Sequence, residues 1–373
     1  MSSKDIRLSD VPEMTVGRVV EKFGKAYSKV INSGMGVKTI PSVMLWGPPG
    51  IGKSQAIRQI AKEIELETGK KVFVTDVRLL LFNPIDLRGI PTSNEDKTLA
   101  VWLKPKIFQM DESEDIVNIL FLDEISAAPQ SVQAAAYQIT LDRTVGEHTL
   151  PDNCIVMAAG NRTTDKSVAY KMPKALANRL LHVDVQGGFE PWLEWAIRSG
   201  INDKVIGYLS FKPSELMKFD AASESLAFAT PRSWEMVSNI LNNVSDDMSE
   251  VYLLVAGVVG IGAATELRHW CKIYSQLPDI ADIFAGKVLK APKEPDLLYA
   301  LTSSMTAYAR EHKTEMNKIN HSLEYAKLMP PDFVSVLLKD YMYIEKGYKQ
   351  ELMSCPAFVD LASKHGRYFN GNI

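Results

Sequence analysis

A glycine-rich segment carries the clearest chemistry in this chain. Residues 47–54 fit the pattern G-x-x-x-x-G-K-[ST]. Glycines let backbone N–H groups surround phosphate oxygens, and the positive end of the following helix dipole adds to the attraction. We expect Lys53 to reach the β- and γ-phosphates and the Ser54 hydroxyl to ligate Mg²⁺. The predicted ATP-binding residues of this segment are Gly47, Pro48, Pro49, Gly50, Ile51, Gly52, Lys53, Ser54 and Gln55.

A pair of acidic residues follows a second apolar segment. Four apolar residues, 119–122, precede Asp123 and Glu124. Open α/β sheets bind ligands at the carboxyl ends of their strands, so Asp123 is predicted to lie near the metal together with Ser54. Glu124 is predicted to act as the general base that polarises the attacking water.

Short β-rich segments and helical patterns alternate through the first half of the chain, which predicts an α/β fold with a mostly parallel sheet. Residues 116–123 form a nearly continuous apolar run, as expected for a central strand covered on both faces. Helices are expected over residues 53–66 and 129–141. The five expected strands are residues 42–46, 71–77, 116–123, 154–160 and 180–185. Two further segments, 89–102 and 144–150, have the turn residues of β-hairpins.

The strand pattern stops after about residue 187. We therefore predict two domains, a nucleotide-binding core over residues 1–188 and an all-helical region over 189–373. The expected helices are residues 189–198, 203–210, 232–241, 250–276, 296–311, 313–327 and 331–346. The most apolar stretch, 251–264, is too short to cross a bilayer roughly 30 Å thick and is predicted to be a buried helix.

The composition narrows the class of protein. The chain has 373 residues, 46% apolar and 23% charged, which is typical of a folded globular protein. A net charge of −3 argues against a broad nucleic-acid footprint. The three cysteines, Cys154, Cys271 and Cys355, are isolated and odd in number, which does not suit a disulfide framework. With no signal-peptide core near the start and no membrane span, we expect a reduced, cytoplasmic setting.

Taken together, these segments resemble the AAA+ superfamily of P-loop NTPases, and within it the MoxR group of the helix-2-insert clade. The resemblance extends from about Val11 beyond Trp234 and weakly to near the end. It implies a three-layer αβα core with a five-stranded parallel sheet, followed by an all-helical lid and a C-terminal helical extension. Residues 84–91 resemble the segment before the helix-2 insert, so the hairpins at 89–102 and 144–150 correspond to that insert and to the pre-sensor-1 hairpin. In this clade both face the ring pore or a bound partner.

The resemblance also implies roles for three polar residues. Asn161, after Ala158-Ala159-Gly160, looks like sensor 1, which contacts the γ-phosphate and the water. Arg179, within residues 175–180, looks like the arginine finger that completes a neighbouring subunit's site, although the family more often has Asp-Arg-Phe where this chain has Asn-Arg-Leu. Arg232, in Thr-Pro-Arg-Ser at 230–233, resembles sensor 2 on the lid.

The function implied by the resemblance is a ring-forming ATPase, a hexamer, that couples ATP hydrolysis to remodelling or activating a protein partner. That partner is expected to contain a von Willebrand factor A domain. A nucleic-acid motor or restriction-type translocase of the same clade is the alternative, but the hairpins carry Glu95, Asp96 and Lys97, and Glu147 and His148, which do not form a track for phosphates. A second alternative is an ATP-gated scaffold with little turnover, against which the intact acidic pair of residues 123 and 124 argues.

Overall fold

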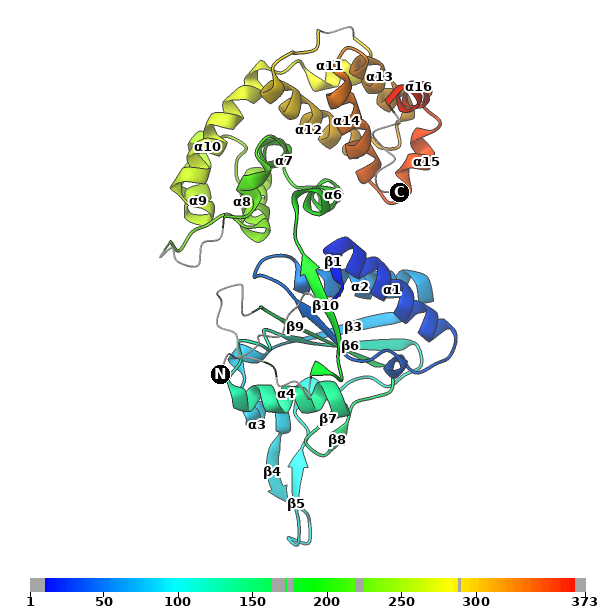
Figure 1. Ribbon diagram of the computed structural model, residues 1–373, viewed down its shortest axis with the longest axis vertical. Helices are drawn as coiled ribbons and strands as arrows, with labels where there is room; N and C mark the ends of the chain where they lie inside the picture. The colour runs from blue at the N-terminus through cyan, green and yellow to red at the C-terminus, as the bar shows by residue number, and fades with distance from the viewer. Residues whose placement is uncertain (1–10, 163–171, 173–176, 219–224, 288–289, 366–373) are drawn as a thin grey trace, which may run out of the picture. The chain divides into compact units, whose positions relative to one another are not determined.

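The computed structural model describes residues 11–162, 172, 177–218, 225–287 and 290–365. The chain divides into two compact units, Met1–Gly187 and Gly188–Ile373. The first is built around a parallel sheet and the second is helical (Figure 1). We refer to them as the sheet unit and the helical unit.

The sheet unit contains six parallel strands in the order β1-β10-β2-β9-β6-β3. The five predicted strands are confirmed, and the prediction of only five was wrong by one. The additional strand is β1, three residues long at the sheet edge, where it pairs with β10. So short a strand shows no alternation in the sequence. The strands are β1 (Glu13–Thr15), β2 (Val43–Trp46), β3 (Lys71–Arg78), β6 (Ile116–Asp123), β9 (Cys154–Gly160) and β10 (Leu181–Gln186).

Helices cover both faces of this sheet. Successive side chains of a strand point to opposite faces, so Ile119 and Phe121 of β6 belong to one apolar cluster and Leu120 and Leu122 to the other. Helices α1 (Val16–Asn32) and α2 (Lys53–Thr68) cover the first face, and α4 (Gln130–Asp142) covers the second (Figure 1). Burial on both faces explains why the sequence of β6 is apolar without alternation.

Both predicted hairpins are present. Strands β4 (Ile90–Ser93) and β5 (Ala100–Leu103) pair in an antiparallel hairpin that projects from the unit beside α3 (Pro84–Arg88) (Figure 1). Strands β7 (Thr144–Val145) and β8 (His148–Thr149) follow α4 and are joined by two residues, Gly146 and Glu147. Short 3₁₀ turns, Leu79–Leu81 and Lys106–Phe108, flank the first hairpin.

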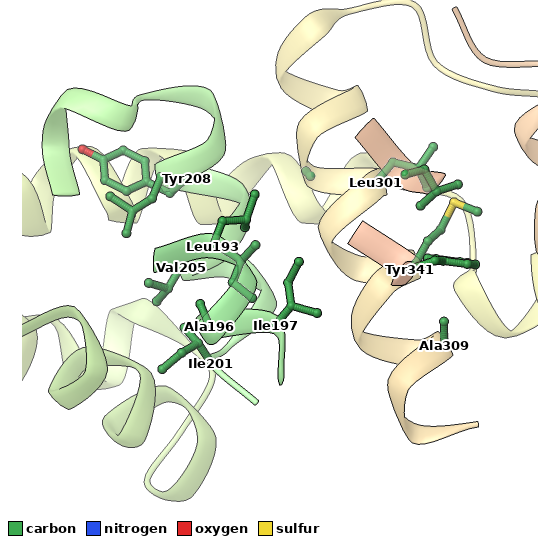
Figure 2. Close-up of a cluster of buried hydrophobic side chains, with 14 of the residues drawn as sticks. Leu193, Ala196, Ile197, Ile201, Val205, Tyr208, Leu301, Ala309 and Tyr341 are labelled. Carbon is green, nitrogen blue, oxygen red and sulfur yellow. The ribbon is translucent and has the colours of Figure 1, made fainter. Parts of the chain in front are cut away.

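The helical unit has one continuous apolar core. Figure 2 shows part of it, where Leu193, Ile197 and Val205 from the first helices and Leu301 and Tyr341 from later ones are buried. Its helices are α6 (Phe189–Ser199), α7 (Asp203–Phe211), α8 (Pro231–Asn243), α9 (Met248–Val259), α10 (Ile261–Cys271), α11 (Ile280–Phe284), α12 (Pro295–Glu311), α13 (Met316–Ala326), α14 (Pro331–Tyr343), α15 (Tyr348–Leu352) and α16 (Pro356–His365).

Two predictions for this unit were wrong. The single helix expected over residues 250–276 is interrupted at Gly260, whose φ of +89° places it outside helical geometry, and a 3₁₀ segment follows α10. The stretch 251–264, expected to be buried, exposes Leu253 by 82% and Ile261 by 73%. Apolar content alone does not show that one side of each helix faces solvent. In the described part of the chain no helix has both the length and the apolar character needed to cross a bilayer.

Candidate nucleotide-binding site

The glycine-rich segment forms a loop between β2 and α2. Gly52 has φ of +102°, a left-handed conformation that residues with a Cβ rarely adopt, and α2 begins at the next residue. Lys53 is only 8% exposed. Its Nζ donates hydrogen bonds to the carbonyl oxygens of Gly47 at 2.6 Å and Pro48 at 3.0 Å. The loop therefore holds the ammonium group where phosphate oxygens are predicted to bind.

Asn161 lies beside this lysine. Strand β9 is the neighbour of β2, with Gly160 opposite Trp46, so the residue after β9 reaches the loop after β2. Lys53 Nζ donates to Asn161 Oδ1 at 3.1 Å. The fold thus brings together two predicted site residues 108 positions apart in the sequence.

The two predicted metal ligands also meet. Ser54 Oγ donates to Asp123 Oδ2 at 2.9 Å. A hydroxyl and a carboxylate are hard oxygen ligands, and Mg²⁺ sites commonly use only one or two protein ligands with phosphates and waters. This pair therefore fits Mg²⁺ in a nucleotide complex.

A second carboxylate contributes to the field around Asp123. Partial burial raises the pKa of Asp76 on β3, and the charge of Asp123 raises it further, whereas Arg78 and Arg58 lower it. Two carboxylates that repel each other in this way are both stabilised by a nearby cation. Asp76 therefore adds negative charge near Asp123, which Arg78 and Arg58 partly offset.

Glu124 is exposed and has an unusual backbone conformation. Its φ is +58°, and left-handed geometry in a residue with a side chain is concentrated at functional sites. The turn that follows is fixed from α4, because Gln133 Nε2 donates to the carbonyl oxygens of Ser126 at 3.2 Å and Ala128 at 3.0 Å. Glu124 is therefore exposed to solvent in the turn directly after β6, and hydrogen bonds from α4 hold that turn.

Nothing in the local sequence indicates that Ser126 belongs to this site. It is 2% exposed, and its Oγ accepts a hydrogen bond from the backbone N–H of Asn161 at 2.8 Å. The contact fixes the backbone of Asn161 from the turn that carries Glu124. A serine after an acidic pair has no distinctive spacing, so only the tertiary structure reveals it.

Arg162 has a structural role that the sequence does not indicate. Its guanidinium forms an ion pair with Asp184 of β10, which is largely buried, and also donates to the Val185 carbonyl oxygen at 3.1 Å. Gln186 Nε2 donates to the same carboxylate at 2.9 Å. These contacts hold the chain immediately after Asn161 against β10.

The two arginines predicted as the arginine finger and as sensor 2 are both exposed. Arg179 lies in the turn just before β10; residues 175 and 176 of its motif are outside the described ranges. Arg232 is the second residue of α8, in the helical unit. The start of α8 is fixed by a capping box in which Thr230 N donates to Ser233 Oγ at 2.7 Å and Ser233 N to Thr230 Oγ1 at 3.1 Å.

Comparison with known proteins agrees with this geometry. Residues 42–182 match the model of the ATPase family associated with various cellular activities (AAA). This segment begins at β2 and includes the glycine-rich loop, the acidic pair, Asn161 and Arg179. Chaperone MoxR1 of Mycobacterium tuberculosis is 27% identical over 143 residues, which are 37% of this chain. The chain therefore contains an AAA ATPase segment over residues 42–182 and is similar over part of its length to a MoxR chaperone.

The matched segment spans only about a third, 34%, of the length of MoxR1. Among solved structures, a RuvB mutant of Thermotoga maritima is 14% identical, with 80% of this chain and 88% of that chain covered and a TM-score of 0.35. NtrX of Brucella abortus in complex with ATP is 13% identical, with 96% and 68% covered and a TM-score of 0.35. ORC2 of Aeropyrum pernix is 12% identical, with 98% and 99% covered and a TM-score of 0.35. Likenesses this weak do not identify the fold; the parallel sheet and its P-loop do.

Proposed function

We propose that this protein is a MoxR-type AAA+ ATPase that forms a hexameric ring in the cytoplasm and couples ATP hydrolysis to remodelling or activating a protein partner. The observation that carries the proposal is the convergence of two contacts at the carboxyl edge of the sheet, Lys53 with Asn161 and Ser54 with Asp123. These groups match the parts of a phosphoryl-transfer site, in which catalysis consists mainly of positioning and charge stabilisation. The intact acidic pair argues against a scaffold that binds ATP without hydrolysing it.

Each residue of the site has a distinct proposed task. The loop residues 47–55 bind the phosphates, and Lys53 stabilises the charge on the β- and γ-phosphate oxygens. Ser54 and Asp123 would hold Mg²⁺, which when bound neutralises phosphate charge. Glu124 orients water and accepts its proton as the water oxygen bonds to the γ-phosphorus. The bond from that phosphorus to the bridging oxygen breaks, and ADP leaves with the bridging oxygen.

The proposal of a ring depends on the two exposed arginines. Asn161 contacts the γ-phosphate within the subunit, whereas an arginine finger acts on charge in a neighbouring subunit. Arg179 is exposed beside β10, as a residue that reaches another chain must be. Arg232 at the start of α8 is proposed to bind the nucleotide from the lid, so that hydrolysis changes the orientation of the lid.

The hairpins favour a protein partner over nucleic acid. The loop that joins β4 to β5 carries Glu95 and Asp96 beside the single basic residue Lys97. In the other hairpin, the His148 ring is engaged with the carbonyl oxygen of Trp102 at 2.8 Å. Binding to a phosphate backbone depends on several lysines or arginines in a row, and these loops do not provide them. A partner with a von Willebrand factor A domain remains the expectation from the MoxR resemblance.

The proposal is tested by comparing two variants in extract. Glu124→Gln should bind ATP but hydrolyse it about 10²–10⁴-fold more slowly, since it lacks the general base, whereas Lys53→Ala should not retain ATP. We expect the ATP-bound Glu124→Gln protein to have the mass of a hexamer by light scattering and to retain a specific protein on affinity capture. Lys53→Ala is the matched control. Identical captured proteins with both variants, recovery of nucleic acid, or a monomer in ATP would contradict the proposal.

A further inference from the structure

A pocket of about 490 Å³ lies at the base of the β4–β5 hairpin, away from the nucleotide-binding residues. Its walls come from the turn before α3, from α3 itself, and from β5 and the segment after it. We propose that this pocket binds a segment of the partner protein in which a bulky apolar side chain is followed by carboxylates. The inference rests on the proposed function, because it assigns the partner's chemistry at the hairpin.

The walls of the pocket are apolar and exposed. Leu81 is 77% exposed, Ile90 60% and Leu103 57%, and Phe82, Ile85 and Ile107 complete the apolar lining. Single exposed apolar residues are common, but a contiguous group that lines a concavity marks a binding surface. The volume is that of ordinary ligand pockets and accommodates one or two bulky side chains.

The base of the hairpin is closely packed. Gly89, which directly precedes β4, has φ of +91°, and a Cβ at this position would lie 2.0 Å from the carbonyl oxygen of Leu103 in β5. The backbone here approaches too closely for any residue with a side chain. The turn between β7 and β8 also packs closely against this base, since a Cβ on Gly146 would lie 2.6 Å from the carbonyl oxygen of Arg88. Backbone approaches this close leave the base of the hairpin little room to rearrange, and a site that rearranges less loses less entropy on binding.

The positive charges at the pocket are complementary to an acidic segment. Lys104 and Lys106 both line it, and neither forms an ion pair with any described residue. The carboxylate of Asp86 also lines the pocket, but it accepts the backbone N–H of Asn83 at 2.8 Å and so caps α3. Two unpaired ammonium groups beside an apolar wall are complementary to an apolar side chain with adjacent carboxylates.

This combination does not suit the other possible occupants. A nucleic-acid backbone needs a longer row of cations and gains little from an aliphatic wall. A lipid surface is usually recognised by a cluster of several basic residues rather than two. An acidic, apolar protein segment uses both features of the pocket.

The test uses a fluorescein-labelled peptide with Leu-Phe-Asp-Asp at its centre and glycine and serine on each side. One control peptide replaces both aspartates by asparagine, and another replaces leucine and phenylalanine by serine. Binding to the full chain is followed by fluorescence anisotropy. The double variant Lys104→Glu, Lys106→Glu should weaken binding of the first peptide at least about tenfold, or about 1.4 kcal/mol, and Leu103→Ser should weaken it without changing its salt dependence.

The matched control is Lys97→Glu, which reverses a charge on the same hairpin outside the pocket lining. It should bind the peptide as the wild type does. Circular dichroism on every variant shows whether the fold is retained, and the exposure of Lys106 and Leu103 makes loss of folding an unexpected result.

Several outcomes would overturn the inference. These are equal binding of the asparagine peptide, unchanged binding by the lysine variant, or loss of the hexamer in that variant, which would make the pocket a contact between copies of the chain. The proposed function is separately testable. Peptide binding without ATP-dependent partner capture would support the proposed pocket and contradict partner remodelling. Partner capture that is unchanged by the lysine substitutions would support remodelling and contradict the pocket as the site of partner binding.

Discussion

Replacing Ser126 by alanine should disturb the candidate sensor Asn161 without touching the nucleotide-binding loop. The substitution removes the hydroxyl oxygen that accepts the Asn161 N–H at 2.8 Å. Leaving a buried donor without an acceptor costs about 1–3 kcal/mol. Because Asn161 is only partly buried, water can replace some of the lost bond, and we expect about 1 kcal/mol. For a unit the size of Met1–Gly187 this lowers Tm by about 2–4 °C.

The effect on catalysis should exceed the effect on stability. Displacing a positioned group by about 1 Å can reduce a rate about 10²-fold, so kcat for ATP hydrolysis should fall about 10- to 100-fold in Ser126→Ala. ATP affinity should stay close to that of the wild type, because the loop and Lys53 are unchanged. The assays are phosphate release at saturating ATP, nucleotide binding by calorimetry and thermal unfolding.

Ser28 provides a matched control. It is also buried, on α1, but its hydroxyl has no hydrogen-bond partner among the described residues. Ser28→Ala therefore deletes the same atom without breaking a bond and should be neutral or slightly stabilising. If the two variants have the same Tm and the same kcat, the hydrogen bond from Asn161 does not position the sensor and our reasoning is wrong.

Two further predictions concern assembly and pH. Mixing Arg179→Ala with Lys53→Ala protein should restore ATPase activity that neither has alone, because the intact site of an Arg179→Ala subunit then receives Arg179 from a Lys53→Ala neighbour. Mixed rings of confirmed stoichiometry that stay inactive would argue against action between subunits. Burial raises the pKa of Asp340 to about 8, while Lys339 lowers it and Glu190 raises it. The folded state thus keeps this proton up to about pH 8 and the unfolded state only to about pH 4, so the free energy of unfolding should fall as pH rises between these values. Asp340→Asn should flatten that decline in urea titrations across this range, and an unchanged slope would show that another group causes it.

The parts of the fold that the sequence predicted are those specified locally. The strand that ends at Asp123 could be found because burial on both faces makes it continuously apolar, and the loop before α2 because phosphate binding requires glycines at fixed spacing. The two-residue turn at Gly146 and Glu147 is likewise determined by neighbouring residues. Each of these signals lies within about ten positions of the chain.

The residues that were missed act across the chain. Ser126 contacts a residue 35 positions away and Arg162 one 22 positions away, and neither contact follows from local spacing. The error at Gly260 has a different cause. Its flanking residues are strongly apolar, and this masked the glycine that ends α9 and the exposed sides of α9 and α10.

Helix α4 joins the candidate site to the proposed partner pocket. At its start, Gln133 holds the turn that carries Glu124, and after its end β7 and β8 lead to His148, which contacts Trp102 in the hairpin. A helix of 13 residues is about 20 Å long, so α4 spans the distance between these two contacts. Only a few residues, which form a tight hairpin, connect α4 to β8. If these contacts couple the turn at Glu124 to the base of the β4–β5 hairpin, a partner bound at the hairpin must act on the turn as strongly as the turn acts on partner binding, because coupling between two binding sites is reciprocal.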